Sequence, residues 1–586
     1  MPRGQPYIGT TRKLVLAIDV GTTYSGVSYC ILTPGEIPKV HSITRFPGQE
    51  GEDKSRDTKI PSVVYYDDGG KVRAVGAEAC LDSTRVEAQE NGWTLVEWFK
   101  LRLRPSGTQG KGESLPKIWI TKSVIDIFAD YLAYLVRCAK EFIAELPLGR
   151  QVLKSEANIE YVMSHPNAWG GKQQNNMRRA AILAGLVPDT HAGHARVHFV
   201  TEGEASLHFC IVNGLTQDIM KVDNHILIVD AGGGTVDLSM YKVLNASPLN
   251  IVESSAPDCL LHGSTFVDTL ARIMLQEKMR DSRFAHSDYI DLMLSCFEMN
   301  TKPTFRDVSK TAYIKFGGPR DTDAGCSIKR GVLSLAGSDI AGLFSPSIDA
   351  IKGAIQAQVR NAGCKPSRIL LVGGFANNRF LRSQLQHFAT SKGMALFCPE
   401  VQTAKAVAEG ALWHHLDHYV SARIARDIYG TSHLKLYDSS LFDRVNRKDS
   451  TIVYADGLIK VADAVLTDQQ GTLVEEEREF RLPLERCSSQ RDTQISAEIL
   501  CYKGALDDPQ WIDEEADLFS VLCTVHADVN PQTYQRRMGV LGEYFTKEYH
   551  VVLLFGLTEL KAQLSWKEKG KERRSPATIV FDDEDA

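Results

Sequence analysis

The sequence lacks the patterns that mark several common protein classes. None of its 12 cysteines belongs to a Cys-x-x-Cys pair, which argues against zinc ribbons and redox dithiols. No apolar run is long enough to cross a bilayer, and the N-terminal residues lack the apolar core of a secretory signal. A net charge of only −6 gives no general attraction for nucleic acid or anionic membranes. We therefore expect a reduced protein of the cytoplasm or nucleus that binds neither nucleic acid nor membrane.

Several functional motifs are missing as well. The chain has no G-x-x-x-x-G-K-[ST], H-E-x-x-H or G-x-S-x-G motif, so Walker-type ATPases, zincins and serine hydrolases have no support. His414, His415 and His418 are close in sequence, but no carboxylate or cysteine joins them at a standard ligand spacing, so we interpret them as a polar helix end. The basic run Lys567–Arg574 contains glutamates and indicates a solvated turn between strands.

The composition is that of an ordinary globular protein. Hydrophobic residues make up 43% and charged residues 24%, which excludes a mainly disordered or collagen-like chain. A length of 586 residues is too great for one core and predicts two to four folding units. Apolar strands alternate with amphipathic helices over residues 14 to about 425, which is typical of the α/β class. Short β-type runs then predict a smaller β-rich domain over 430–580, and we expect tails at 1–13 and at the acidic residues 581–586.

The most specific feature is a glycine turn that occurs twice, each time after a buried strand with an aspartate at its end. The first is Asp19-Val20-Gly21-Thr22-Thr23, and the second is Asp230-Ala231-Gly232-Gly233-Gly234-Thr235, followed by Asp237. Glycine lets backbone N–H groups approach a phosphate because it carries no Cβ. A carboxylate at the strand end suits hydrated Mg²⁺, which prefers hard oxygen ligands. Two such turns facing each other would hold a triphosphate from both sides.

Three segments carry a resemblance to a known family. Ala17–Tyr24, Ile228–Ser239 and Ile369–Gly374 resemble the two phosphate motifs and the adenosine motif of the actin, sugar-kinase and heat-shock ATPase superfamily. Within it the chain resembles the heat-shock 70-kDa (DnaK-like) chaperones, and in particular a divergent branch with an altered C-terminal region. The resemblance implies an actin-like ATPase domain of two lobes, each with a ribonuclease-H-like fold. Lobe I would span 14–225, completed by 404–428, and lobe II would span 226–403.

The resemblance also implies a magnesium–nucleotide site that hydrolyses ATP slowly. The catalytic residues would be Lys100, Glu202, Asp230 and Asp237, with Glu204 as a competitor for the role of Glu202. Asp19 and Asp230 would hold Mg²⁺ through water. The residues that would bind ATP or ADP are Gly21, Thr22, Thr23, Tyr24, Gly232, Gly233, Gly234, Thr235, Glu298, Lys302, Gly373 and Gly374.

Several of these residues have a second interpretation. Lys100 would stabilise charge that develops on the transferred phosphoryl group, or it is a solvated lysine on an aromatic-faced helix. Glu298 and Lys302 would bind the purine, or they form an ion pair on a helix surface. Pro166 would relay nucleotide state between domains, whereas we expect its neighbour His165 to have no part in catalysis.

The adenosine side departs most from the family pattern. After Gly373 and Gly374 the chain continues Phe375-Ala376-Asn377-Asn378, where the chaperones usually carry a small hydroxyl residue and an arginine. Arg379 is the candidate substitute for that arginine. These departures leave ATP as the predicted nucleotide and weaken the expectation of a high affinity.

The leading functional hypothesis is a chaperone-like switch. Loss of the γ-phosphate would let the lobes rotate and alter the C-terminal domain through Pro166 and a helix predicted over Ala404–Ile428. That domain would bind unfolded peptide or a client protein as part of a stress response. One alternative is a small-molecule kinase of the same superfamily, which would need an aspartate base beside the γ-phosphate, where Asn167 follows Pro166 instead. The other is a nucleotide-dependent scaffold or filament protein with negligible turnover.

Overall fold

The computed structural model contains both helices and strands along most of the chain, so the protein has the mixed α/β class that the sequence predicts. The described residues are 5–50, 59–105, 115, 118–213, 220–399, 405–438, 451–467, 471–476, 478–504, 506, 509, 511–512, 515–554 and 559–579. They divide into two compact units, which are Met1–Trp169 with Asn176–Val420, and Gly170–Asn175 with Ser421–Ala586. No helix in these ranges has both the length and the apolar character of a membrane span. The predicted acidic tail lies outside the described residues.

The first sheet of the larger unit carries the first glycine turn. Its strands follow the order β3-β2-β1-β8-β9, and β4 also pairs with β2. β1 and β2 form an antiparallel hairpin, whereas β8 pairs with β1, and β9 with β8, in parallel. The strands are β1 (Lys13–Asp19), β2 (Tyr24–Leu32), β3 (His41–Ser42), β4 (Lys59–Pro61), β8 (Ile159–His165) and β9 (Val197–Thr201). β1 is a nearly continuous apolar run, as expected for a strand with both faces buried, whereas β8 also carries Glu160, Ser164 and His165.

A second sheet repeats this arrangement around the second glycine turn. Its order within the larger unit is β18-β17-β10-β11-β12, with β13 also paired to β11. β10 and β11 form the hairpin, and β17 and β18 follow in parallel. The strands are β10 (His225–Ala231), β11 (Val236–Ala246), β12 (Leu249–Glu253), β13 (Asp258–Leu260), β17 (Arg368–Val372) and β18 (Leu396–Phe397). The two aspartates therefore occupy matching places, with Asp19 paired to Gly26 and Asp230 paired to Asp237.

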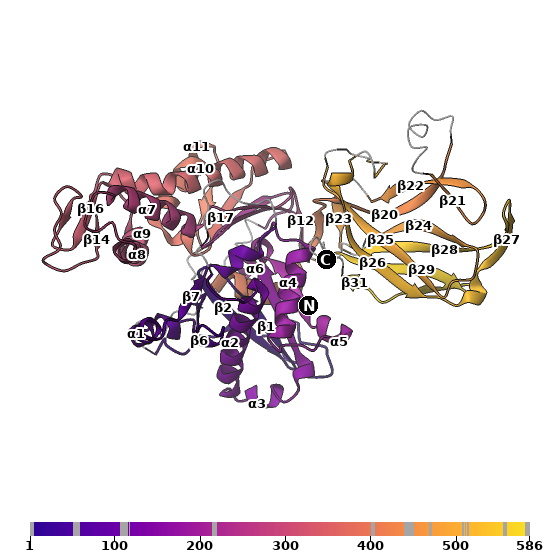
Figure 1. Cartoon of the computed structure of the whole chain (residues 1–586), viewed down its shortest axis with the longest axis horizontal. Coiled ribbons are helices and arrows are strands. Elements are labelled where there is room, and N and C mark those ends of the chain that lie inside the picture. Colours follow the sequence, from indigo (N-terminus) through magenta and orange to yellow (C-terminus); the bar gives the residue numbers. More distant parts are fainter. Residues whose placement is uncertain are drawn as a thin grey trace. The chain divides into compact units, whose positions relative to one another are not determined.

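The helices of the larger unit cover these sheets and separate its core into several clusters. Figure 1 shows α2 beside the first sheet and α10 and α11 beside the second, and each group shares one buried apolar cluster with its sheet. α6 and α12 pack so closely that a Cβ on Gly410 would lie 1.8 Å from the carbonyl oxygen of Ala205. The helices are α1 (Asp82–Asn91), α2 (Val124–Ala144), α3 (Gly149–Val152), α4 (Gly171–Leu183), α5 (His191–His194), α6 (Glu202–Asn213), α7 (Ser264–Lys278), α8 (Ser287–Cys296), α9 (Lys302–Thr304), α10 (Gly337–Ala362), α11 (Arg379–Ser391) and α12 (Ala406–Asp417).

Two small sheets and several short helical turns complete the larger unit. One sheet has the order β6-β5-β7 and the other β14-β16-β15. Their strands are β5 (Val63–Tyr66), β6 (Val72–Val75), β7 (Thr94–Glu97), β14 (Ala312–Lys315), β15 (Ile328–Lys329) and β16 (Val332–Leu335). Lys100 lies in a 3₁₀ turn, Phe99–Leu103, and Glu298 in a π turn, Phe297–Thr301.

The smaller unit is built mainly of strands. One sheet has the order β21-β22-β20-β25-β26, and another has β24-β28-β29-β30 with β27 on β28 and β31 on β29; β19 pairs with β23. Apolar residues of both sheets, among them Ile499 and Val551, form one core because buried and exposed side chains alternate along strands such as β26. The strands are β19 (Val420–Ile424), β20 (Ile428–Leu436), β21 (Thr451–Val453), β22 (Ile459–Leu466), β23 (Leu473–Glu475), β24 (Glu479–Ser488), β25 (Gln494–Tyr502), β26 (Phe519–Asp528), β27 (Gln535–Gly539), β28 (Gly542–Leu554), β29 (Lys561–Glu568), β30 (Lys571–Arg574) and β31 (Thr578–Ile579).

The helix predicted over Ala404–Ile428 is wrong in its second half. α12 ends at Asp417, His418 adopts the left-handed conformation with φ 43°, and the chain continues as β19 and β20. The left-handed residue ends the helix, and the β-branched and aromatic residues beyond it favour strands. The first compact unit ends at Val420. Ala404 lies outside the described residues.

Candidate functional site

The two glycine turns lie directly against each other in the larger unit. A Cβ on Gly233 would lie 2.3 Å from the Oγ1 of Thr23, and a Cβ on Gly234 would lie 2.3 Å from the Oγ1 of Thr22. Both distances are far below van der Waals contact, so the turns approach this closely only because glycine lacks a Cβ. The structure thus brings the two sequence motifs together in one place.

The start of α7 holds the second turn from its carbonyl side. The N–H of Ser264 donates to the carbonyl oxygen of Gly232 at 3.1 Å, and the N–H of Thr265 donates to that of Gly233 at 2.9 Å. The Thr265 hydroxyl also donates to the carbonyl of Gly233, at 3.1 Å. Among the described residues, the N–H groups of Gly233 and Gly234 make no hydrogen bond. The turn therefore keeps amide donors of the kind that bind phosphate oxygens.

Two buried carboxylates beside the turns, Asp230 and Asp237, form no ion pair among the described residues. Asp230 accepts a hydrogen bond from the Ser206 hydroxyl at 2.6 Å, and Asp237 accepts one from the N–H of Asn167 at 2.6 Å. The Oδ2 of Asp237 is buried and has no hydrogen-bond partner among the described residues. Burial, and then the charge of Glu202, raise the pKa of Asp230 to about 7 and that of Asp237 to about 8. A divalent cation would offset this repulsion, so the donor set fits Mg²⁺.

Lys100 is a buried member of the same site. Its Nζ donates to the Oε1 of Glu202 at 2.6 Å and lies 5.8 Å from the ring of Trp169. Burial lowers the pKa of Lys100, but the charges of Glu202 and Asp19 outweigh burial, so the pKa is raised overall. The interpretation of Lys100 as a solvated lysine is wrong, because the residue is only 4% exposed.

Asp19 differs from the other two aspartates because the protein supplies its counter-charge. Lys59 on β4 donates to its Oδ2 at 2.8 Å, and the Ser164 hydroxyl on β8 donates to its Oδ1 at 3.1 Å. Burial raises the pKa of Asp19, but Lys59 and Lys100 outweigh burial and lower it overall. Lys59 and Ser164 were not identified from the sequence, since neither belongs to a motif.

Asn167 is a further site residue, which the sequence marked only as standing where a kinase would need an aspartate base. Its side chain is fully buried, and its Nδ2 donates to the carbonyl of Leu238 at 3.1 Å and to the Ser239 hydroxyl at 2.9 Å. Its Oδ1 accepts from the N–H of Gly203 at 3.3 Å, and its own N–H binds Asp237. Asn167 thereby links the end of β8 to β11 and α6.

The two acidic residues at the start of α6 have different partners. Glu202 pairs with Lys100, whereas the Oε1 of Glu204 lies 3.2 Å from the Nε2 of His414 on α12. Glu204 is therefore oriented toward a histidine, and Glu202 is the member of the pair that joins Lys100. Tyr24, the first residue of β2, is 52% exposed.

The residues predicted for the adenosine side form a second group. Lys302 pairs with Asp268 of α7 at 2.6 Å, so the alternative ion pair between Glu298 and Lys302 is wrong. Burial, followed by the charge of Asp268, raises the pKa of Glu298 to about 8. The Nδ2 of Asn378 donates to the carbonyl oxygen of Lys302 at 2.8 Å, which joins this group to the segment that follows Gly373 and Gly374.

Gly373 and Gly374 follow β17, and Gly373 lies against Asp230. Gly373 has φ +92°, and a Cβ there would lie 2.4 Å from the carbonyl oxygen of Ala231 and from the Oδ1 of Asp230. Any other residue would be strained by this φ and would collide with the strand. Gly374 follows, and Arg379 begins α11.

A partly open pocket adjoins the turns. Thr22 and Thr235, one from each turn, line it together with Lys100. The remaining lining residues are Leu101, Arg104, Pro105, Pro166, Ala168, Trp169, Cys259 and Leu261. Hydroxyl and cationic groups thus border a space beside the glycine turns, as an anionic ligand requires.

The metal-free protein is expected to lose stability through Asp237 as the pH rises from about 4 to 8. The folded pKa, about 8, exceeds the unfolded value of about 3.9, so the folded state keeps a proton that the unfolded state releases. Each step up in pH within this window therefore favours unfolding. Asp237→Asn cannot ionise and should raise the melting temperature at pH 8 by a few degrees in EDTA, with a clearly smaller gain at pH 5. An equal gain at both pH values, or a similar gain in the exposed control Asp281→Asn, would contradict this assignment.

Comparison with known proteins places the chain near one group. No family model matches it. It is similar to heat shock 70 kDa protein 12A of Mus musculus, with 23% identity over 507 residues that cover 73% of each chain. It is also similar to heat shock 70 kDa protein 12B of Homo sapiens, at 20% over 474 residues and 66% of each chain. A third relative is the heat shock cognate HSP70 protein of Trypanosoma brucei brucei, at 24% over 339 residues, or 56% of this chain and 46% of the relative.

The chain thus spans slightly less than two thirds of the length of the human relative, and less than half of the trypanosome protein. The matches extend over much of the chain and fall on members of one family. They confirm the resemblance to a divergent branch of the heat-shock 70 kDa proteins.

Proposed function

We propose that the chain is an ATP-binding molecular switch that holds Mg-ATP between two lobes of an actin-like ATPase domain and hydrolyses it slowly. The observation that carries this proposal is the contact between the two glycine turns, Thr22-Thr23 against Gly233-Gly234, beside buried carboxylates. The repeated strand order of the two sheets supports a duplicated, two-lobed domain. The similarity to heat-shock 70 kDa proteins supports ATP as the nucleotide.

The side chains of the site have complementary roles in this proposal. Mg²⁺, when bound, would neutralise charge on the phosphates. Asp230 and Asp237 would hold the ion through water, and their raised pKa values support a need for positive charge. Asp19 would take part while it remains bonded to Lys59. The amide and hydroxyl groups of the two turns would bind the phosphate oxygens.

Hydrolysis would use the buried ion pair between Lys100 and Glu202. Water would attack the γ-phosphate, and the Lys100 ammonium would stabilise the negative charge that develops during transfer. Glu202 would orient the attacking water. Because the pair is buried, its electrostatic effect is screened less than it would be at the surface.

We further propose that nucleotide state reaches the C-terminal region through Pro166 and the chain that follows α12. Pro166 borders the pocket beside the turns, and the next residue, Asn167, binds both Asp237 and α6. A change at Asp237 is therefore transmitted directly to the end of β8. The C-terminal domain would hold unfolded peptide or a client protein, a role that the family resemblance supports.

Nucleotide binding and turnover can be tested on the untagged native protein. Mass spectrometry should detect ADP or ATP that co-purifies, and Mg-ATP at about 100 times its dissociation constant should stabilise the protein by about 2.7 kcal/mol. Phosphate release should be slow and should increase with unfolded peptide. The control is Mg²⁺ with a nucleotide-free buffer in the same melting experiment.

Other outcomes would redirect or overturn the proposal. ADP release only when a particular metabolite is added would favour a kinase. Concentration-dependent sedimentation without phosphate release would favour a filament protein. The absence of any thermal shift with ATP or ADP at millimolar concentration would refute the nucleotide site itself.

A further inference from the structure

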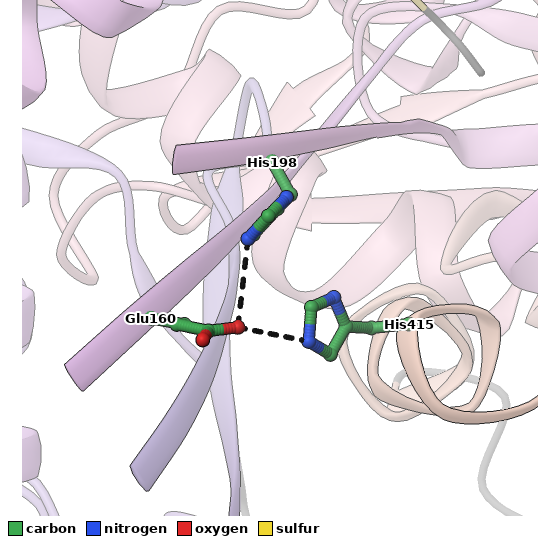
Figure 2. A group of neighbouring side chains, drawn as sticks. All are labelled: Glu160, His198 and His415. Atoms are coloured by element: carbon green, nitrogen blue, oxygen red, sulfur yellow. Dashed lines mark ion pairs between the residues drawn. The ribbon is translucent and has the colours of Figure 1, made fainter. Parts of the chain in front are cut away.

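Three side chains that can bind a metal lie close together at the end of β8 that is far from the proposed nucleotide site. Glu160 lies on β8, His198 on the neighbouring strand β9, and His415 on α12 (Figure 2). The Oε2 of Glu160 lies 3.5 Å from the Nε2 of His198 and 3.2 Å from the Nε2 of His415. Both imidazoles thus point their Nε2 at the same carboxylate oxygen, as Figure 2 shows.

The spacing of these atoms suits a tetrahedral ion. With metal–ligand bonds of about 2.0–2.2 Å, two ligand atoms of a tetrahedral Zn²⁺ site lie about 3.4 Å apart. The two nitrogen–oxygen separations, 3.2 and 3.5 Å, bracket that value. All three ligand atoms lie within 4.8 Å of one another, so the nitrogen–nitrogen edge needs to shorten by at most about 1.4 Å. Small side-chain rotations can supply this.

A second observation points to a missing ligand. The Nε2 of His198 is buried and has no hydrogen-bond partner in the described part of the chain, although the charged carboxylate is near. A buried ring nitrogen without a partner is unfavourable, and coordination to a metal would satisfy it.

The surroundings of the carboxylate favour its use as a ligand. The Nζ of Lys13 on β1 donates to Oε1, the other oxygen of Glu160, so that Oε2 is directed toward the histidines. Outer partners of this kind fix the orientation of metal ligands.

We propose that Glu160, His198 and His415 bind a divalent transition-metal ion of the Zn²⁺ class, with water as a fourth ligand. Two imidazoles and one carboxylate select such ions over Mg²⁺ or Ca²⁺. The His198 side chain is 35% exposed, so the site lies close to the protein surface although its Nε2 is buried. The ion would join α12 to the β8–β9 pair, and because the three ligands come from rigid elements the site is largely preformed.

This site is separate from the proposed nucleotide site. Glu160 is the second residue of β8, whereas Ser164, which binds Asp19, is four residues further along the strand. That separation corresponds to about 13 Å at a rise of about 3.3 Å per residue. Metal binding can therefore be tested without nucleotide.

The experiment is a titration of untagged, full-length protein with Zn²⁺ by calorimetry, and with Co²⁺ by visible absorption. We expect one equivalent of Zn²⁺ to bind at micromolar concentration or below, and Co²⁺ to give the intense bands of a tetrahedral site. His198→Gln and His415→Gln should each weaken Zn²⁺ binding at least about tenfold and abolish those bands. His414→Gln is the matched control, because its Nε2 faces Glu204 instead, and it should bind Zn²⁺ like the native protein.

The outcomes separate the proposal from its competitors. Circular dichroism and melting in EDTA show whether each variant folds. If His415→Gln does not fold, His198→Gln, whose side chain is more exposed, decides the question. Zn²⁺ binding that is absent from the native protein, unchanged in folded His198→Gln, or lost in His414→Gln would overturn the assignment. Native stabilisation by Zn²⁺ that disappears in both ligand variants would establish it.

Discussion

Replacing Lys100 with methionine is expected to slow ATP hydrolysis about 100- to 1,000-fold, with a much smaller effect on ATP affinity. Lys100 is buried against Glu202, beside the two turns, and the charges of Glu202 and Asp19 raise its pKa, so it is cationic at every physiological pH. A cation held in place in a buried site stabilises developing charge without reorganising at the moment of reaction. Single-turnover phosphate release measures the rate, and calorimetry with Mg-ADP measures binding.

The variant needs controls for stability, because Glu202 would be left buried without its partner. Breaking a buried ion pair by removing one member costs about 3–5 kcal/mol. Lys100→Met with Glu202→Gln removes both charges and should regain stability while hydrolysis stays slow. Lys122→Met removes a half-exposed cation that pairs with Asp130, outside the site, and should leave turnover unchanged. Turnover in folded Lys100→Met equal to that of the native protein would exclude a catalytic role.

Replacing Gly234 with valine is expected to weaken ATP binding at least about 100-fold, which corresponds to about 2.7 kcal/mol. A Cβ at this position would lie 2.3 Å from the Oγ1 of Thr22 and 2.7 Å from the Cδ2 of Leu101. The two turns must then separate, and the added methyl groups would also shield amide donors from a phosphate. Equilibrium binding of a fluorescent ATP analogue measures the loss.

Gly342→Val provides the matched control for this substitution. Gly342 lies in α10, and a Cβ there would have no neighbour within 4 Å, so the same change adds volume without a collision. It should bind nucleotide like the native protein. If Gly234→Val melts as the native protein does without nucleotide and still binds ATP with native affinity, the turn is not a phosphate site.

Local sequence signals were sufficient to predict the turns, but not the partners of their residues. A buried strand followed by Asp and closely spaced glycines predicts a hairpin with an exposed amide edge, because strand burial and glycine conformation are local properties. The role of Lys59 could not be predicted in this way. Lys59 meets Asp19 only because β4 pairs with β2 beside the first turn.

The histidines of α12 are a second case in which the sequence did not indicate the partners of its residues. In the sequence, His414 and His415 are adjacent, and no carboxylate lies at a ligand spacing, so the pattern indicated only a polar helix end. Consecutive residues of a helix point in different directions, and the fold offers each of them a different acid. His414 faces Glu204 of α6, and His415 faces Glu160 of β8.

The sequence by itself determined the α/β class, the two glycine turns and the resemblance to the heat-shock 70 kDa proteins, because each depends on residues that are neighbours along the chain. The tertiary structure alone decided that the turns touch, that Lys302 pairs with Asp268 rather than Glu298, and that α12 ends at Asp417. These features depend on contacts between residues that are distant in sequence or on packing that overrides local propensity. Charge compensation in a buried site is such a feature, since a carboxylate acquires its partner only when the chain is folded.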